Sequence, residues 1–389
     1  MNKTSRTPHA VVTETGTESA VVAAFRDALV RGERAFLWGV PGGGALAALG
    51  EGDAPWRVGA SGFRGEGPMW RPARVVFHGA AFGPGVEVAT AASPAGAPTT
   101  QRSLPGGLAG GASSECAPSG PTRHWIDAVG RATSAMRAGA LRKVVLARQS
   151  VRRASAGEGF DATATWQALR AANPGAFTFA VAEAGRVFLG ASPERLVSLV
   201  DGTLQTEALA GTLSRAGAPE TLLASAKDRE EHALVVAEIV SGLGPFVEPG
   251  TLCWDPNPGL KALPRIWHLH TPITARLRSG ATLLDVVRAL HPTPAVCGVP
   301  RAAAARFLRE NEGFERDLYA GPVGWVSDAG EGTFAVGLRS ALLTGDTATL
   351  YAGAGLVAAS EATAEWHETA LKLRTVEETL RTRGVSRPC

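Results

Sequence analysis

The pattern that most constrains the fold is the alternation of helix-like and strand-like segments over residues 124–383. Segments with helical periodicity are repeatedly followed by short runs of β-branched residues, and the Asp201-Gly202 pair between two such runs is a hairpin turn signal. Interleaved helices and hairpins predict a mixed α/β (α+β) protein in which both halves contribute strands to one core.

The same pattern predicts the bounds of the elements. Helices are expected at residues 19–32, 124–140, 161–172, 221–243, 283–290, 301–312 and 360–383. Strands are expected at residues 35–40, 143–151, 176–182, 186–191, 196–200, 203–208, 324–327, 332–339 and 348–352.

Composition divides the chain into segments. Residues 1–17 are polar, and the stretch from 93 to 122 consists almost entirely of Ala, Gly, Pro and Ser, so neither can bury enough apolar surface to offset its ordering entropy. We therefore predict five segments: a disordered N-terminus (1–17), an N-terminal part of the fold (18–92), a flexible loop (93–122), a catalytic region (123–383) and a tail (384–389).

Charge and cysteine content narrow the class of protein. The 39 basic and 36 acidic residues give a net charge of +3 without a Lys/Arg-rich run, so no nucleic-acid partner is expected, while a small anionic metabolite is compatible. The four cysteines form no CxxC pair, which predicts a reduced protein without disulfides. A signal-like segment and an apolar run of about 18 residues are both missing, so we expect a cytoplasmic protein without a membrane partner.

Two acidic clusters far apart in sequence are candidate metal sites. One lies in the segment KDREEH from Lys227, and the other in EATAEWHETALK from Glu361. Each places carboxylates three or four residues apart, on one face of a helix. Four acids could then meet across a cleft and hold Mg²⁺: Asp228, Glu231, Glu365 and Glu368. The alternative for each cluster is a solvated helix face.

Two residues beside apolar strands are candidates for proton transfer. Lys143 opens the strand KVVLAR, and desolvation lowers the pKa of a lysine, which suits a base; the alternative is a lysine that reaches water from the strand end. Glu194 follows a proline turn in GASPER, where burial would suit a proton donor. The alternative for Glu194 is an ion pair with Arg195.

Other signals are weaker. The GAGLVA stretch from Gly353 matches a GxGxxA dinucleotide fingerprint, but the chain ends too soon for a second βαβ half. His268 and His270 lie on the same side of an extended strand, and without a nearby third ligand, hydrogen bonding beside a polar substrate is the preferred interpretation over zinc.

Ten stretches, in order over roughly residues 125–380, resemble the chorismate-utilising enzymes, a family that includes isochorismate synthase, anthranilate synthase large subunit, aminodeoxychorismate synthase and salicylate synthase. The stretches are KVVLAR at Lys143, GASPERL at Gly190, TEALAGT at Thr206, SAKDREEH at Ser225, WHL at Trp267, HPTPAVCG at His291, YAGPVGW at Tyr319, VGLRSA at Val336, YAGAGLV at Tyr351 and EWHETALK at Glu365.

This resemblance implies a fold, a cofactor and a set of contacts. The fold would be two large, mostly antiparallel sheets packed face to face, with helices outside, in a monomer. Mg²⁺ would be held by Glu231 and Glu368, with Asp228 and Glu365 acting directly or through water, and would bind the ring carboxylate of chorismate. The substrate contacts implied are Arg339 to the enolpyruvyl carboxylate, backbone amides near Gly355 and Thr212 to carboxylates, Lys372 to the metal-bound end, and His268 near the C4 hydroxyl.

The resemblance also bears on the reaction. In HPTPAVCG this chain has Ala295 where members that use ammonia, and the salicylate synthases, have threonine. The form with alanine is similar to the isochorismate synthases. By this resemblance Lys143 activates water for attack at C2 of chorismate and Glu194 protonates the departing C4 hydroxyl. A salicylate synthase, an amine-using anthranilate or aminodeoxychorismate synthase, and a non-catalytic protein of this fold remain alternatives. The pathway stays open between siderophore, menaquinone and salicylate biosynthesis, with a leaning toward the siderophore type.

Overall fold

The computed structural model describes residues 12–15, 17–51, 56–60, 63–64, 69, 74–78 and 122–384. The helices are α1 (Glu18–Val30), α2 (Arg123–Arg137), α3 (Ala162–Ala172), α4 (Pro219–Ala224), α5 (Ala226–Leu243), α6 (Leu283–Leu290), α7 (Arg301–Asn311) and α8 (Ala362–Glu377). The strands are β1 (Val12–Thr15), β2 (Ala35–Gly39), β3 (Ala45–Leu49), β4 (Trp56–Ala60), β5 (Arg74–His78), β6 (Lys143–Arg153), β7 (Glu158–Phe160), β8 (Phe177–Glu183), β9 (Arg186–Ser192), β10 (Arg195–Val200), β11 (Thr203–Ser214), β12 (Cys253–Trp254), β13 (Gly259–Ala262), β14 (Ile266–Arg276), β15 (Gly298–Val299), β16 (Pro322–Ser327), β17 (Gly332–Val336), β18 (Ser340–Thr344), β19 (Thr347–Leu356) and β20 (Thr382–Gly384).

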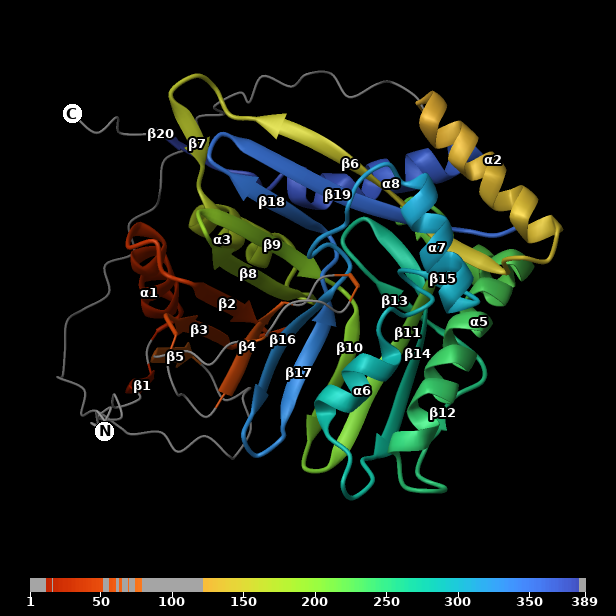
Figure 1. Ribbon diagram of the computed structural model, residues 1–389, viewed down its shortest axis with the longest axis horizontal. Helices are drawn as coiled ribbons and strands as arrows, with labels where there is room; N and C mark the ends of the chain where they lie inside the picture. The colour runs from red at the N-terminus through yellow and green to blue at the C-terminus, as the bar shows by residue number, and fades with distance from the viewer. Residues whose placement is uncertain are drawn as a thin grey trace, which may run out of the picture.

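Two large sheets form the centre of the molecule (Figure 1). The ten-stranded sheet has the order β1-β5-β3-β2-β8-β9-β18-β19-β6-β15. The eight-stranded sheet has the order β12-β14-β11-β10-β17-β16-β4, with β13 also paired to β14. Apart from the parallel pair β1 and β5, the strands of both sheets pair antiparallel.

An apolar layer joins the two sheets. Trp38 and Phe179 of the ten-stranded sheet lie in one buried cluster with Val323 and Trp325 of the eight-stranded sheet. Separate clusters lie under the outer helices: α1, α3 and α8 cover the ten-stranded sheet, and α5 and α6 cover the eight-stranded sheet. The predicted architecture of two mostly antiparallel sheets packed face to face, with helices outside, is confirmed.

Most predicted elements form, but two helices differ from expectation. The helix expected over residues 221–243 is two helices, because Ser225 adopts extended φ and ψ and its hydroxyl accepts from the Asp228 N–H to cap α5. The helix expected over 360–383 ends at Glu377, and β20 then pairs with β7. The Arg381 N–H donates to Thr165 Oγ1 at 3.0 Å, so contacts distant in sequence fix this ending.

Further segments differ from the predictions, and one predicted segment lies largely outside the described residues. The strand expected over 332–339 ends at Val336, and β18 follows it in the other sheet. The GAGLVA stretch lies mostly in β19, which extends to Leu356, so it does not form a dinucleotide turn. Val12–Thr15 form β1 within the segment expected to be disordered, and residues 93–121 of the expected loop lie outside the described residues.

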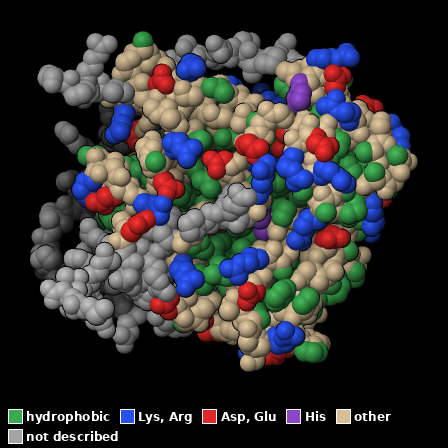
Figure 2. Space-filling model, viewed as in Figure 1, with side chains coloured by type: hydrophobic (Ala, Val, Ile, Leu, Met, Phe, Trp, Pro, Cys, Tyr) green, Lys and Arg blue, Asp and Glu red, His purple; other side chains and the backbone are tan. Residues whose placement is uncertain are grey.

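The surface agrees with the mixed charge of the sequence. On the face shown in Figure 2, Lys and Arg side chains are interspersed with Asp and Glu. Among the helices that the structure describes, we find none with the length and apolar character needed to cross a membrane.

Candidate active site

A pocket brings together most of the residues singled out from the sequence. Strands of both sheets contribute to its walls, together with α5 and α8. Its lining includes the predicted residues Lys143, Glu194, Thr212, Glu231, His268, Ala295, Arg339, Gly355, Glu368 and Lys372. Asp228 and Glu365 are not among the residues that line it.

Two points where the chain crosses between the sheets carry polar side chains into this pocket. Glu194 lies between β9 of the ten-stranded sheet and β10 of the eight-stranded sheet, and Arg339 lies between β17 and β18, which cross in the reverse direction. Arg339 has φ of 49°, a left-handed conformation that non-glycine residues rarely adopt. Such a backbone conformation is sustained only where the surroundings fix it, and it occurs often at functional sites.

Lys143 lies at the base of the pocket, in an ion pair with Glu231. The lysine is 1% exposed, and its Nζ lies 3.0 Å from Glu231 Oε1. The alternative of a lysine reaching water is therefore wrong, and the expected desolvation is confirmed. Gly355 makes room for the pair, because a Cβ at this position would lie 2.4 Å from Glu231 Oε1 and 3.2 Å from Lys143 Cε.

Glu194 is buried, and its surroundings favour the protonated form of its carboxyl group. Burial raises its pKa to about 7, and the negative charge of Glu207 adds to this effect against the opposing charges of Lys143, Lys261 and Arg339. The alternative of an ion pair with Arg195 has no support, because the Arg195 guanidinium donates to Gln205 Oε1 at 2.7 Å.

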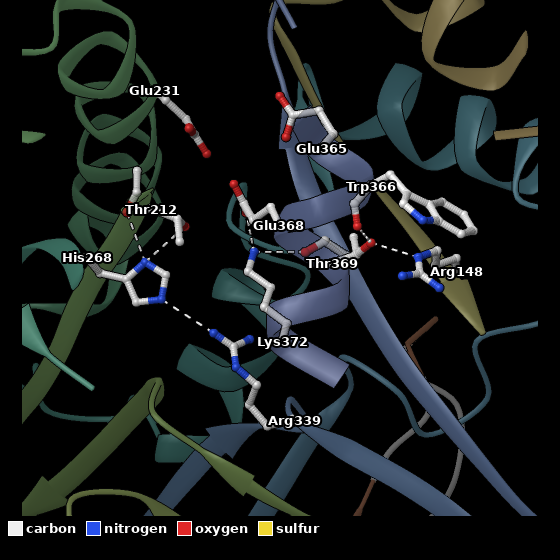
Figure 3. A network of polar contacts seen from close by, with 12 residues as sticks. Arg148, Thr212, Glu231, His268, Arg339, Glu365, Trp366, Glu368, Thr369 and Lys372 are labelled. Carbon is white, nitrogen blue, oxygen red and sulfur yellow. Dashed lines mark hydrogen bonds and ion pairs between the residues drawn. The ribbon is translucent and has the colours of Figure 1, made fainter. Parts of the chain in front are cut away.

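His268 connects Thr212 with Arg339 (Figure 3). Its Nδ1 lies 2.9 Å from the Gly211 carbonyl, which can only accept, so Nδ1 carries the proton. Its Nε2 is then an acceptor for Arg339 Nη2 at 3.4 Å. Burial and the charge of Arg339 hold the pKa of His268 well below its usual range, so the ring is neutral. His270 instead lies 2.8 Å from Glu207 Oε2, so the two histidines do not form a metal pair.

Three of the four predicted acids face one another. Figure 3 shows the carboxylates of Glu231, Glu365 and Glu368 pointing toward a common space between α5 and α8. Burial is the main cause that raises the pKa of Glu365, and the negative charge of Glu368 is the second. The two carboxylates therefore repel each other electrostatically. The Asp228 carboxylate accepts from the Ser225 hydroxyl at the start of α5. The participation of Asp228 in the same site stays a prediction.

Lysines neutralise these acids in the structure. Lys372 Nζ lies 2.5 Å from Glu368 Oε1 and 2.9 Å from the Gly353 carbonyl, and Lys227 Nζ lies 3.4 Å from Glu365 Oε1. Within the described ranges, no three His, Cys, Asp or Glu side chains form a finished metal-binding group. Carboxylates that face a common space are nevertheless the ligand type that a hard cation such as Mg²⁺ prefers, and the missing Cβ at Gly355 leaves space for the Glu231 carboxylate.

The sequence did not single out several residues that lie at the pocket. Tyr319 and Tyr351 stack with ring centroids 5.1 Å apart and line it. Glu207 and Lys261 lie directly behind Glu194 and are joined at 2.8 Å. Tyr319, Tyr351 and Glu207 lie in the recognised stretches YAGPVGW, YAGAGLV and TEALAGT, but their types and spacing alone predict no role.

Comparison with known proteins agrees with this geometry. A Pseudomonas aeruginosa protein named salicylate biosynthesis isochorismate synthase is 45% identical over 285 residues, which cover 68% of this chain and 58% of that protein. The menaquinone-specific isochorismate synthase structure from Escherichia coli has a TM-score of 0.70 and 27% identity, covering 90% of this chain and 89% of that chain. A structure assigned to a 2,3-dihydroxybenzoate-specific isochorismate synthase from Bacillus anthracis has a TM-score of 0.73 and 26% identity, covering 91% of this chain and 98% of that chain.

The family assignment rests on a match that covers most of the region predicted to be catalytic. The family model described as chorismate binding enzyme matches residues 111–381, which include every residue of the pocket named above. The resemblance inferred from the ordered motifs is thereby confirmed. The chain belongs to the chorismate binding enzyme family.

Proposed function

We propose that this chain is a Mg²⁺-dependent isochorismate synthase, which adds water at C2 of chorismate and releases the C4 hydroxyl. One observation carries the proposal: Lys143 and Glu194, a candidate base and a candidate acid, line one buried pocket together with Arg339 and two carboxylates, Glu231 and Glu368. The names of the relatives support the same reaction. The aligned region spans 58% of the Pseudomonas aeruginosa protein, so the activity of the chain itself is what has to be measured.

The pocket has cationic groups for an anionic substrate. Chorismate carries two carboxylates, and the planar guanidinium of Arg339 can hold one of them by two parallel hydrogen bonds. His268 restrains this guanidinium from one side through the contact at 3.4 Å. The backbone near Gly355 and Thr212 would contact carboxylate oxygens, and Lys372 would contact the metal-bound end, where it now lies on Glu368.

The acidic cluster would hold the metal ion through Glu231 and Glu368, with Glu365 beside them. When bound, Mg²⁺ supplies orientation and charge neutralisation for the ring carboxylate. Lys143 lies in an ion pair with Glu231, whereas a base needs its amine free to accept a proton. Its proposed role therefore requires that Glu231 have a different cationic partner during turnover.

The proposed proton transfers balance. Water forms the new C2–O bond and gives its proton to the Lys143 amine, the ring double bonds shift, and the C4–O bond breaks. Glu194, whose pKa is raised to about 7, gives its proton to the leaving oxygen, which departs as water. One water enters and one leaves, so isochorismate is an isomer of chorismate. Ala295 lines the same pocket, and in this proposal its small side chain would leave space for the entering water.

Product analysis tests this proposal. The protein is incubated with chorismate and Mg²⁺ in ¹⁸O-labelled water, and the products are separated. We expect isochorismate labelled at C2, and no turnover after chelation of the metal. Salicylate with free pyruvate would instead indicate a salicylate synthase, and an aminated product with added ammonium an amine-using enzyme.

Variants separate the roles within the site. Lys143→Ala and Glu194→Gln are expected to abolish turnover. Glu231→Ala is expected to abolish the turnover that Mg²⁺ supports. Glu377→Gln is a matched control, since Glu377 also forms an ion pair, with Arg152, but does not line the pocket. Turnover that survives in Lys143→Ala or Glu194→Gln would overturn the assignment of base and acid.

A further inference from the structure

A group of three polar residues lies directly behind the turn that carries Glu194. Glu207 on β11 faces Lys261 on β13 and His270 on β14, three strands that are neighbours in the eight-stranded sheet. Lys261 Nζ and His270 Nε2 each lie 2.8 Å from Glu207 Oε2. The Glu207 side chain is only 12% exposed, so these contacts are largely shielded from water.

This group holds the backbone on both sides of Glu194. The Arg195 N–H donates to Glu207 Oε1 at 3.0 Å, and Lys261 Nζ donates to the Pro193 carbonyl at 2.8 Å. Glu207 thus binds the residue after Glu194 directly and the residue before it through Lys261. A side chain on a turn points in a defined direction only when the backbone of the turn is fixed, and these two bonds fix it.

The charge of Glu207 also acts on Glu194. Burial alone would raise the pKa of Glu207, but hydrogen bonds from His270 and Lys261 and the charge of Lys261 lower it to about 2. Glu207 is therefore ionised wherever Glu194 titrates, and its negative charge is the second cause, after burial, that raises the pKa of Glu194. Three positive charges lower the pKa of Glu194, namely those of Lys143 on β6, Lys261 on β13 and Arg339 before β18. Tyr319 also interacts electrostatically with Glu194.

We propose that Glu207 is a positioning residue for the acid of the reaction: it fixes the Glu194 turn through Arg195 and Lys261, and its charge favours the acid form of Glu194. This inference rests on the proposed function, because it requires Glu194 to donate a proton. A merely structural ion pair between β11 and β13 would make the same contacts, but it would not change how activity depends on pH.

The pH dependence of kcat/KM in Glu207→Gln tests the proposal. Glutamine keeps the shape and can accept from Arg195, but it lacks the charge. Activity needs protonated Glu194, so it is present below the pKa and lost as the pH rises through it. The limb at high pH should move to lower pH by roughly one unit. At a pH well below the limb, the rate should change by less than about tenfold, because Glu194 is protonated in both proteins.

A second variant gives the opposite sign. Lys261→Gln removes a positive charge that lowers the pKa of Glu194, so the limb should move to higher pH. If Glu207→Gln does not fold, an unchanged limb in Lys261→Gln overturns the proposal. Glu377→Gln, which removes a carboxylate from an ion pair outside the pocket, should leave the limb in place. Unchanged limbs in both variants, or a loss of rate that is equal at every pH, would overturn the proposal.

The failure of this inference is distinguishable from failure of the proposed function. If the wild-type protein forms no isochorismate, the proposed function fails, and the effect of Glu207 is then read from the ¹³C carboxyl resonance of Glu194. That resonance is identified by its loss in Glu194→Gln and titrated in the wild-type protein and in Glu207→Gln. A titration midpoint that is the same in both overturns the role of Glu207, and a lower midpoint in Glu207→Gln supports it.

Discussion

Gly355→Ala is expected to damage the proposed metal site while leaving the fold intact. The added Cβ would lie 2.4 Å from Glu231 Oε1, whereas ordinary contacts begin at 3.4 Å, so the carboxylate has to move by about 1 Å. That oxygen is at the end of a flexible side chain, so the side chain gives way rather than the strand. A displacement of this size in a supporting contact costs about 10- to 100-fold in metal affinity.

The assay is turnover of chorismate as a function of Mg²⁺ concentration. We expect the Mg²⁺ midpoint of Gly355→Ala to rise by about 10- to 100-fold, and the rate at saturating Mg²⁺ to fall by up to about 100-fold. Its unfolding free energy in urea should change by only about 0.5–1.5 kcal/mol, the cost of one off-rotamer side chain.

The matched control is Gly130→Ala. Gly130 is in α2, and a Cβ there would have no atom within 4 Å. Alanine should stabilise the helix by about 0.5–1 kcal/mol and leave the Mg²⁺ midpoint unchanged. If Gly355→Ala matched the wild-type protein in both midpoint and rate, the reasoning that Gly355 clears space for Glu231 would be refuted.

Three further predictions address the acid, the substrate contact and the core. The kcat/KM of the wild-type protein should fall as pH rises through about 7, where Glu194 loses its proton, and a limb that persists in an active Glu194→Gln variant would contradict this. Arg339→Lys should raise KM for chorismate by about 10- to 100-fold, the loss of one charged hydrogen bond of about 1.5–3 kcal/mol, and an unchanged KM would remove Arg339 from the site. Glu312→Gln leaves Arg316 buried without its ion-pair partner and should cost about 3–5 kcal/mol in urea unfolding; a cost below about 1 kcal/mol would show that the pair is dispensable.

Much of the fold followed from local patterns in the sequence. Asp201-Gly202 predicted the hairpin of β10 and β11, and the periodicity of residues 283–290 predicted α6 with the bounds that the structure has. Such elements are set by turn chemistry and by the spacing of apolar residues, which act over a few residues. Ser225 shows the limit of this reasoning, because a residue compatible with a helix interior instead begins a new helix by capping it.

The candidate site was only partly accessible from the sequence. The ordered motifs indicated Lys143, Glu194 and the two helices that carry the acidic clusters, and the pocket gathers most of these residues. They did not indicate that the Asp228 carboxylate would accept from the Ser225 hydroxyl, or that Glu207 would accept from the N–H of the residue after Glu194. Whether a carboxylate binds a hydroxyl, a lysine or a metal depends on which groups lie within a few ångströms of it. The order of residues along the chain does not give these distances.

The sequence by itself determined the family, the types of chemical group available and most of the strands and helices. Tertiary structure alone decided how these groups meet. Glu194 and Arg339 are 145 positions apart, from 194 to 339, yet both lie where the chain crosses between the two sheets. Burial raises the pKa of Glu194, and the packing of α5 on the eight-stranded sheet brings Glu231 against Lys143. Desolvation and short-range charge interactions depend on packing in three dimensions rather than on order along the chain.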